Sequence, residues 1–166
     1  IFPKSGCLNI KNLKYDNEGL WSISYPDLAD ILSKHLKVFD SDDFKLSTIV
    51  DATAGLGGNL LSFSRYFEKI YGIEIDDTRF ELLENNDKNN NQTNINCIKG
   101  NSIELLKSGD LIKFIENPDV IFFDPPWGGP NYKFEKDVEL TLSDLKFDKI
   151  KELVDKLKKV KLIVLK

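Results

Sequence analysis

A series of short apolar runs without polar alternation constrains the fold of this chain more than any other feature. Such runs are typical of parallel strands that are buried on both faces. The stretches between them carry apolar residues at helical spacing, and the runs themselves are Thr48–Val50, Ile70–Ile73, Ile95–Ile98, Val120–Phe123 and Leu162–Leu165. This alternation predicts an α/β fold, a mostly parallel sheet with helices on both faces.

Composition and charge fit one globular domain. A chain of 166 residues can build one core, and no apolar run approaches the ~20 residues of a membrane span, so we expect no membrane association. Only Cys7 and Cys97 occur, without a CxxC or Cys/His cluster, so we expect no disulfide framework, no metal and a reducing intracellular compartment. The net charge of −4 argues against a broad basic face that coats nucleic acid, but a polyanion can still bind locally. We expect a monomer.

The ends of the chain carry further signals. Residues 1–6 lack the charged and apolar regions of a signal peptide, so we expect none. Pro26 begins an amphipathic helix that should lie against the sheet, with an apolar face formed by Leu28, Ile31, Leu32 and Leu36. Near the C-terminus, Ser143 or Asp144 is predicted to cap a helix whose apolar face is formed by Leu145, Ile150, Leu153, Val154 and Leu157.

A glycine-rich turn follows the first predicted strand directly and precedes a helix. Residues 51–59 read DATAGLGGN. Glycines at such a turn let the backbone approach a ligand that a Cβ would block. The spacing differs from phosphate-binding loops and resembles motif I of class I methyltransferases, DxxxGxGG. That resemblance implies S-adenosylmethionine as cofactor, with its amino-acid end held by Asp51, Gly55, Gly57 and Asn59.

Polar residues also follow the next two predicted strands. A carboxylate at the end of the second strand can accept both ribose hydroxyls of an adenosine, and Glu74 is the first candidate for this role, Asp76 the second. After the third strand come Asn101 and Ser102, where methyltransferases of this class commonly place a side chain on the adenine amino group. All four are therefore candidate cofactor-binding residues.

The most specific segment follows the fourth predicted strand, where residues 124–132 read DPPWGGPNY. An amine on a nucleobase is a poor nucleophile because its lone pair is delocalised into the ring. If the amine donates its hydrogens to Asp124 and to the carbonyl of Pro125, the lone pair becomes localised on nitrogen, and the prolines fix where that carbonyl points. Trp127 offers a face on which the base can stack. These residues predict methylation of an exocyclic amino nitrogen without a metal.

The longer string PPWGGPxY resembles the trimethylguanosine synthase family, which methylates guanine N2 of an N7-methylated RNA cap. Residues 16–26, DNEGLWSISYP, are similar to that family's DxEGWFSVTP segment apart from one extra residue. Asn85 and Asn86 fall where the family has a paired Asn. The resemblance covers residues 16–132 and implies that Trp127 stacks on 7-methylguanine, that Asn86 hydrogen-bonds its edge, and that Tyr132 belongs to the same site.

The resemblance also implies an organisation and a partner. We expect a Rossmann-like class I methyltransferase core over residues 26–166, an N-terminal extension over residues 1–25 that closes over the active site, and capped RNA as substrate. A cellular eukaryotic member would act in the nucleus, and a viral one in the host cytoplasm or virion. The family often has Ser in place of Asp124, and the chain ends after the fifth strand, so we expect the C-terminal hairpin to be absent. Two alternatives explain why the chain ends there: either the sequence is a shortened form of a longer protein, or the protein is a reduced member of the family.

Three other interpretations stay open. An N6-adenine methyltransferase acting on DNA or RNA would share Asp124 to Trp127, but it needs base flipping and a wider basic surface. A catalytically inactive cap-binding module would bind 7-methylguanosine without methyl transfer. A protein-glutamine methyltransferase usually has Asn in place of Asp124 and Tyr in place of Trp127.

Overall fold

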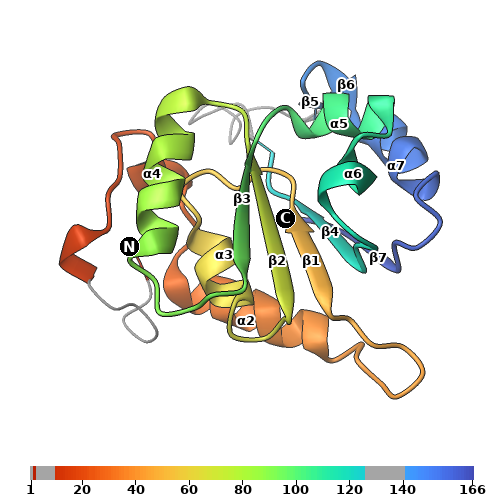
Figure 1. The fold of residues 1–166 in the computed structure, drawn as a ribbon, viewed down its shortest axis with the longest axis horizontal. Helices are drawn as coiled ribbons and strands as arrows, with labels where there is room; N and C mark the ends of the chain where they lie inside the picture. Colours follow the sequence, from red (N-terminus) through yellow and green to blue (C-terminus); the bar gives the residue numbers. More distant parts are fainter. Residues whose placement is uncertain (1, 3–9, 126–140) are drawn as a thin grey trace, which may run out of the picture.

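The computed structural model describes residues 2, 10–125 and 141–166. In this part of the chain, five parallel strands form one sheet in the order β3–β2–β1–β4–β7 (Figure 1). The strands are β1 (Thr48–Asp51), β2 (Lys69–Glu74), β3 (Ile95–Lys99), β4 (Val120–Phe123) and β7 (Leu162–Leu165). They coincide with the five apolar runs, so the predicted parallel sheet is confirmed.

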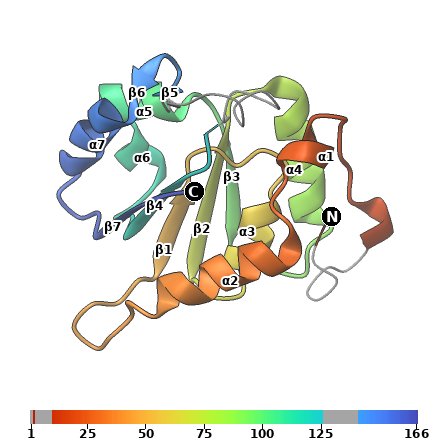
Figure 2. The same ribbon diagram turned by 180° about the vertical axis from the view of Figure 1, so that it is seen from behind.

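Helices cover both faces of this sheet, as predicted (Figures 1 and 2). Successive strand residues point to opposite faces, so Ile49 and Phe122 belong to one core cluster while Val50 and Phe123 belong to the other. The first cluster is completed by α2 (Pro26–Lys37), α3 (Gly58–Phe63) and α4 (Asp77–Lys88), and the second by α5 (Ser102–Ser108), α6 (Leu111–Phe114) and α7 (Phe147–Asp155). The short elements η1 (Ile10–Asn12), α1 (Gly19–Ser22), β5 (Thr141–Leu142) and β6 (Leu145–Lys146) lie outside these layers.

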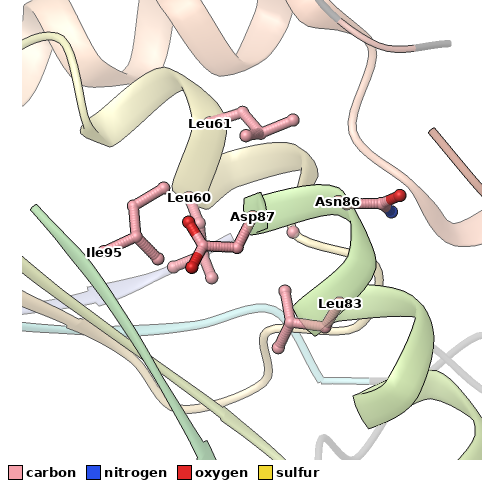
Figure 3. Close-up of a pocket in the computed structure, with 7 residues that line it drawn as sticks. Leu60, Leu61, Leu83, Asn86, Asp87 and Ile95 are labelled. Atoms are coloured by element: carbon pink, nitrogen blue, oxygen red, sulfur yellow. The ribbon is translucent and has the colours of Figure 1, made fainter. Parts of the chain in front are cut away.

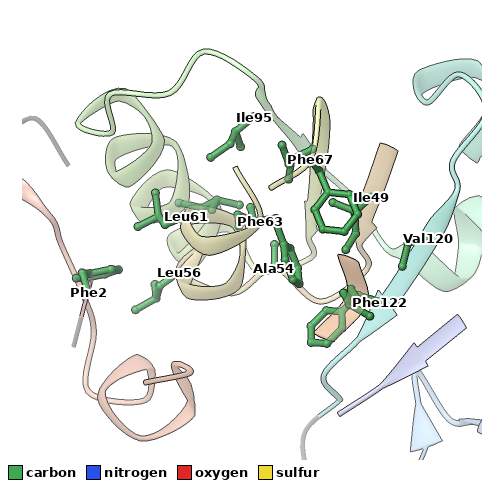
Figure 4. Packing of buried hydrophobic residues seen from close by; sticks show 14 of the residues in the cluster. Phe2, Ile49, Ala54, Leu56, Leu61, Phe63, Phe67, Ile95, Val120 and Phe122 are labelled. Carbon is green, nitrogen blue, oxygen red and sulfur yellow. The ribbon is translucent and has the colours of Figure 1, made fainter. Parts of the chain in front are cut away.

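The first cluster is built around aromatic side chains from α3 and β4 (Figure 4). The rings of Phe63 and Phe122 meet edge to face with centroids 5.4 Å apart, and neither side chain is exposed. Burying one such side chain contributes ~1.5–3 kcal/mol. The short helix α3 is therefore held to the sheet by packing rather than by its own length.

The helix α2 begins at Pro26 as predicted, but its predicted apolar face is partly wrong. Leu28 and Ile31 are 56% and 50% exposed, and the buried residues are Ala29, Ser33 and Leu36. The hydroxyl of Ser33 lies 2.8 Å from that of Ser62 on α3, and it also donates to the carbonyl of Ala29. Small residues let the two helices approach closely, so α2 packs on α3.

The predicted N-cap of the last helix is also wrong. Ser143 and Asp144 have φ of 50° and 60° and form the two-residue turn between the antiparallel strands β5 and β6. Positive φ at both positions is the geometry of a tight hairpin turn, for which Asp is a favoured residue. The helix α7 begins three residues later, after Lys146, which makes no side-chain cap.

The helical spacing between the third and fourth predicted strands is confirmed, and the structure divides this stretch into two short helices. Gly109 adopts φ 74° and ends α5, and α6 begins at Leu111. Glycine accepts this left-handed conformation without steric cost, which makes it a common helix terminator. Ile103 and Ile115 nevertheless stay in the same core cluster.

The strand order reverses direction at β1, which pairs with β2 on one side and with β4 on the other. In open α/β sheets, ligands bind at the carboxyl ends of the strands beside such a switch point. The turn after Asp51 lies there, and so do Asp124 and Pro125. Across the residues that the structure describes, no helix is both long and apolar enough to cross a bilayer.

Candidate active site

The glycine-rich turn joins β1 to α3 and is anchored on both neighbouring strands. The amide of Ala52 donates to the carbonyl of Phe122 on β4, and the amide of Ala54 donates to that of Ile73 on β2, both at 2.9 Å. Gly55 and Gly57 have φ of 54° and 87°, which only glycine adopts without strain. A Cβ on Gly55 would meet no atom within 4 Å, so the backbone there faces open space.

Asp51 lies at the bottom of this turn and is completely buried. Its Oδ1 accepts from the amide of Thr53 at 3.0 Å and from the Thr53 hydroxyl at 3.3 Å. Its Oδ2 finds no hydrogen-bond partner among the described residues. Burial, reinforced by the nearby charge of Asp124, raises the pKa of Asp51 to about 7. A second buried acceptor without a described partner, Oδ1 of Asn59, lies on the first turn of α3.

Glu74 ends β2 and holds the turn from the other side. It is 6% exposed, and its Oε2 accepts from the amide of Gly55 at 2.8 Å while Oε1 accepts from the amide of Asp76 at 2.8 Å. A carboxylate oxygen can accept a second hydrogen bond, so both oxygens keep capacity for hydroxyl donors. Glu74, the first candidate for the ribose, therefore lies beside the open space at Gly55.

The other predicted cofactor residues begin helices. Asp76 is the N-cap of α4 and accepts from the amide of Arg79 at 2.9 Å. Asn101 is the N-cap of α5, and its Oδ1 accepts from the amide of Ile103 at 2.9 Å and from the Ser143 hydroxyl at 3.3 Å. Ser102 is the buried first residue of α5. These caps fix where α4 and α5 begin. Among these described residues, Glu74 is the one that hydrogen-bonds to the glycine-rich turn.

Asp124 follows β4 directly and is tied to the same turn. Its amide donates to the hydroxyl of Thr53 at 2.7 Å, so Thr53 bridges Asp124 and Asp51. Pro125 is buried. The predicted residues Trp127 and Tyr132 lie outside the described residues.

Lys166 and Ser24 complete the surroundings of Asp124, and the sequence did not single them out. The ammonium of Lys166 donates to Oδ2 of Asp124 at 2.6 Å and to the hydroxyl of Ser24 at 2.7 Å. The pairing follows from the register, because Leu165 lies beside Phe123 in the parallel pair of β4 and β7. The strand order would have been needed to find this contact.

Asn86, which the resemblance assigns to the base edge, is fully buried near the end of α4. Its Oδ1 accepts from the amide of Lys14 at 2.7 Å and from Nδ2 of Asn85 at 3.3 Å. Its Nδ2 donates to the carbonyls of Lys14 and Leu56, both at 3.0 Å. These bonds occupy both donors and both acceptor positions of the amide, so a contact with a base requires one of them to be released.

Residues 10–25, called here the N-terminal segment, pack against the glycine-rich turn. A Cβ on Gly19 would overlap the side chain of Leu56 at 2.0 Å, and a Cβ on Gly58 would lie 2.6 Å from Ile23. The segment is also tied to α4, because Arg79 pairs with both Asp16 and Glu18. The predicted closure of this extension over the active site stays a prediction; the described part lies on the turn.

A narrow gap between α3 and α4 lies behind the turn (Figure 3). Side chains from both helices and β3 line it, and it has no room for a water molecule. Of the predicted site residues, Gly57 and Asn86 line the gap, whereas Asp51 and Glu74 do not. The gap is therefore a packing feature and not the binding site. In the described part of the chain, no group of three or more metal-ligating side chains occurs.

The sequence is similar to known proteins over most of its length. Residues 46–165 match the model of a family described as RNA cap guanine-N2 methyltransferases. An uncharacterized protein of Acanthamoeba polyphaga mimivirus is 32% identical over 152 residues, covering 80% of this chain and 58% of that protein. The trimethylguanosine synthase of Schizosaccharomyces pombe is 28% identical over 125 residues, covering 70% of this chain and 49% of the synthase. The chain thus spans about half the length of these relatives.

Solved structures share the fold at low sequence identity. The precorrin-6y C5,15-methyltransferase of Geobacter metallireducens aligns with a TM-score of 0.61 at 15% identity, over 99% of this chain and 72% of that one. An rRNA methylase of Streptococcus thermophilus aligns with a TM-score of 0.54 at 13% identity, over 87% of this chain and 72% of that one. Identities this low are evidence for the fold alone, and they confirm the predicted Rossmann-like methyltransferase fold.

Proposed function

This chain belongs to the RNA cap guanine-N2 methyltransferase family, and we propose that it methylates the exocyclic N2 of 7-methylguanosine in the 5′ cap of an RNA. One observation carries the proposal. The family match spans residues 46–165, and within it the turn at Asp51 and the strand end at Asp124 are joined by the hydroxyl of Thr53. Because Thr53 belongs to both the proposed cofactor site and the proposed acceptor site, the two ligands would lie close enough for direct transfer of a methyl group.

The turn suits S-adenosylmethionine as cofactor. Bound there, the cofactor supplies an electrophilic methyl group. Glu74 would hold the ribose hydroxyls, while Asp51, Asn59 and the backbone at Gly55 and Gly57 would hold the amino-acid end. The buried acceptors Oδ2 of Asp51 and Oδ1 of Asn59, which lack described partners, match the donors of an ammonium group.

The adenine would lie near the start of α5, where Asn101 and Ser102 follow β3. Because Oδ1 of Asn101 already caps the helix, an adenine amino group would share that oxygen. Asp76 remains the second candidate for the ribose.

We assign to Asp124 the role of binding the amine that reacts. Its Oδ2 accepts from Lys166, so Oδ1 is the oxygen left to accept a hydrogen from the amine and the proton released after transfer. The carbonyl of Pro125 would take the second hydrogen. Two such bonds localise the nitrogen lone pair, which is the main obstacle to attack by an aromatic amine.

Recognition of the cap would depend on the methylated base. N7 methylation makes guanine cationic, and a cation over the face of Trp127 gains more than a neutral base does. We also propose Tyr132 and Asn86 as residues of this subsite, Asn86 after release of one of its present bonds.

Transfer of tritium from labelled S-adenosylmethionine tests the proposal. We expect label on 7-methyl-GTP and on capped RNA, and none on GTP or on an adenine-containing oligonucleotide. Label on the oligonucleotide alone would overturn the choice of substrate. It would favour adenine N6, the alternative that Asp124 supports, because the family often has Ser at this position.

A third outcome separates an enzyme from a binding module. If 7-methyl-GDP quenches tryptophan fluorescence but no acceptor is labelled, the chain binds the cap without methyl transfer. That result would contradict the proposed activity while leaving the proposed cap site in place.

A further inference from the structure

Asn86 is fully buried and, among the described residues, it is the side chain that hydrogen-bonds to both the glycine-rich turn and the N-terminal segment. We infer that it is a positioning residue that couples cofactor binding at the turn to docking of the N-terminal segment. This inference rests on the proposed function, because it requires a ligand at the turn. The positioning role differs from the proposed contact of Asn86 with the base, because it uses the hydrogen bonds that the Asn86 amide already makes within the chain.

In the N-terminal segment, Asn86 binds the backbone of Lys14. Its side-chain amide makes the same pair of hydrogen bonds that the backbone of a neighbouring strand would make. It accepts from the Lys14 amide at 2.7 Å and donates to the Lys14 carbonyl at 3.0 Å. Asn86 is 0% exposed, and hydrogen bonds away from water are electrostatically stronger than exposed ones. The other two amide contacts of the segment are exposed: Asn12 donates to Asn89 at 3.3 Å, and Asn85 donates to the carbonyl of Asn12 at 2.8 Å.

On the side of the turn, two side chains hold adjacent residues from opposite directions. Glu74 accepts from the amide of Gly55, and Asn86 donates to the carbonyl of Leu56. The side chain of Leu56 is 3% exposed and lies against Gly19 of the segment. A ligand that orders the turn through Glu74 therefore also fixes the carbonyl that Asn86 binds.

The consequence is mutual stabilisation. A cofactor that holds the turn favours the bonds of Asn86 to Lys14, and with them the docked segment, whose Ser24 accepts from the same Lys166 ammonium that donates to Asp124. Thermodynamic linkage makes the effect reciprocal, so docking of the segment must strengthen cofactor binding by the same factor. Cofactor binding and completion of the acceptor site therefore favour each other.

Amide hydrogen exchange in the full 166-residue chain tests this coupling without any substitution. The amide of Lys14 is the reporter, because it donates directly to Asn86. We expect saturating S-adenosylhomocysteine to slow its exchange at least ~5-fold, the lower end of typical couplings. Binding of S-adenosylhomocysteine, measured by calorimetry, with unchanged exchange at Lys14 overturns the coupling alone. Failure to bind overturns the proposed function and the coupling together.

Asn86→Ala should make the Lys14 amide exchange faster, and S-adenosylhomocysteine should no longer slow this exchange. The substitution should also raise the Kd for S-adenosylhomocysteine. The factor should equal the one by which the ligand slows Lys14 exchange in the unsubstituted chain. The matched control is Asn89→Ala, which removes the asparagine at the C-cap of the same helix. Asn89 contacts the segment at Asn12, and no hydrogen bond joins it to Leu56. The control should keep both effects. An Asn86→Ala chain that retains the full ligand-induced slowing would overturn the inference.

Because Asn86 is buried, its substitution could prevent folding, which far-UV circular dichroism would reveal. Lys14→Pro then provides the test from the exposed side, since proline lacks the amide hydrogen that Asn86 accepts. We expect native circular dichroism and a Kd for S-adenosylhomocysteine weakened several-fold. A Kd equal to that of the unsubstituted chain would overturn the coupling.

Discussion

At the scale of single residues, the site is dominated by carboxylates at the ends of neighbouring strands. Asp51 is wholly buried with one oxygen lacking a described partner, and Asp124 lies close enough to oppose its ionisation. Lys166 forms an ion pair with Asp124. Its charge also lowers the pKa of Asp51, but this effect is the smallest of those that act on that carboxyl group. The protonation of Asp51 should therefore respond to pH near neutrality.

The first prediction concerns this titration. Burial raises the pKa of Asp51 from 3.8 to about 7, so between these values the unfolded chain releases a proton that the folded chain keeps. The contribution of Asp51 to the free energy of unfolding should fall as pH rises from 4 to 7 and level off above 7, by ~4 kcal/mol for ~3 pKa units. Urea unfolding from pH 4 to pH 8 measures it, with Asp51→Asn as reference. Parallel profiles for the two proteins would contradict the assignment.

The second prediction separates chemistry from cofactor binding. Asp124→Asn removes the charge and one acceptor oxygen while keeping the side-chain shape. We expect kcat for methyl transfer to fall ~10²-fold, as for loss of a group that handles a proton, and the Kd for S-adenosylhomocysteine to change less than ~2-fold. Asp148→Asn, an exposed carboxylate on α7, should leave both values unchanged. Wild-type kcat in Asp124→Asn would remove Asp124 from the reaction.

At the scale of elements, the contact between α3 and the N-terminal segment depends on glycine. Gly58 is the first residue of α3 and faces Ile23. A Cβ added to Gly58 would lie 2.6 Å from Cγ1 of Ile23. Alanine favours a helix over glycine by up to ~1 kcal/mol, whereas overpacking costs ~1–3 kcal/mol. The clash should therefore exceed the gain in helix propensity.

The third prediction follows as a double-mutant cycle. Gly58→Ala should lower the free energy of unfolding by ~1 kcal/mol in the native background. In an Ile23→Ala background the same change should be neutral or stabilising, because the opposing side chain is gone. Urea denaturation of the four proteins measures the coupling. Equal effects in the two backgrounds would mean that Ile23 does not pack on Gly58.

At the scale of the whole molecule, the sequence predicted the parts that local patterns determine. The five strands, the parallel sheet and the position of the turn followed from apolar runs and glycine spacing. The exposed face of Leu28 and Ile31 did not, because the burial of α2 depends on its packing against α3, which is distant in sequence. The hairpin turn at Ser143 did not either, because β5 and β6 have two residues each and show no recognisable alternation. The contact of Lys166 with Asp124, 42 positions away, required the strand order, and the bonds of Asn86 required the path of the N-terminal segment.

The last prediction treats the sheet as one cooperative unit. A ligand bound at the switch point as proposed would contact the β1–β2–β3 side through Glu74, which holds the turn at Gly55, and would adjoin β4 through Thr53, whose hydroxyl accepts from the amide of Asp124. If these strands unfold together, S-adenosylhomocysteine at 100 times its Kd should raise the free energy of unfolding of the whole chain by ~2.7 kcal/mol. Urea curves followed by tryptophan fluorescence and by far-UV circular dichroism should shift together with an unchanged slope. Glu74→Gln, which weakens a hydroxyl acceptor without altering shape, should reduce the shift at the same ligand concentration. Separate midpoints for the two signals would mean that the chain does not unfold as one cooperative unit, and that the ligand stabilises only part of it.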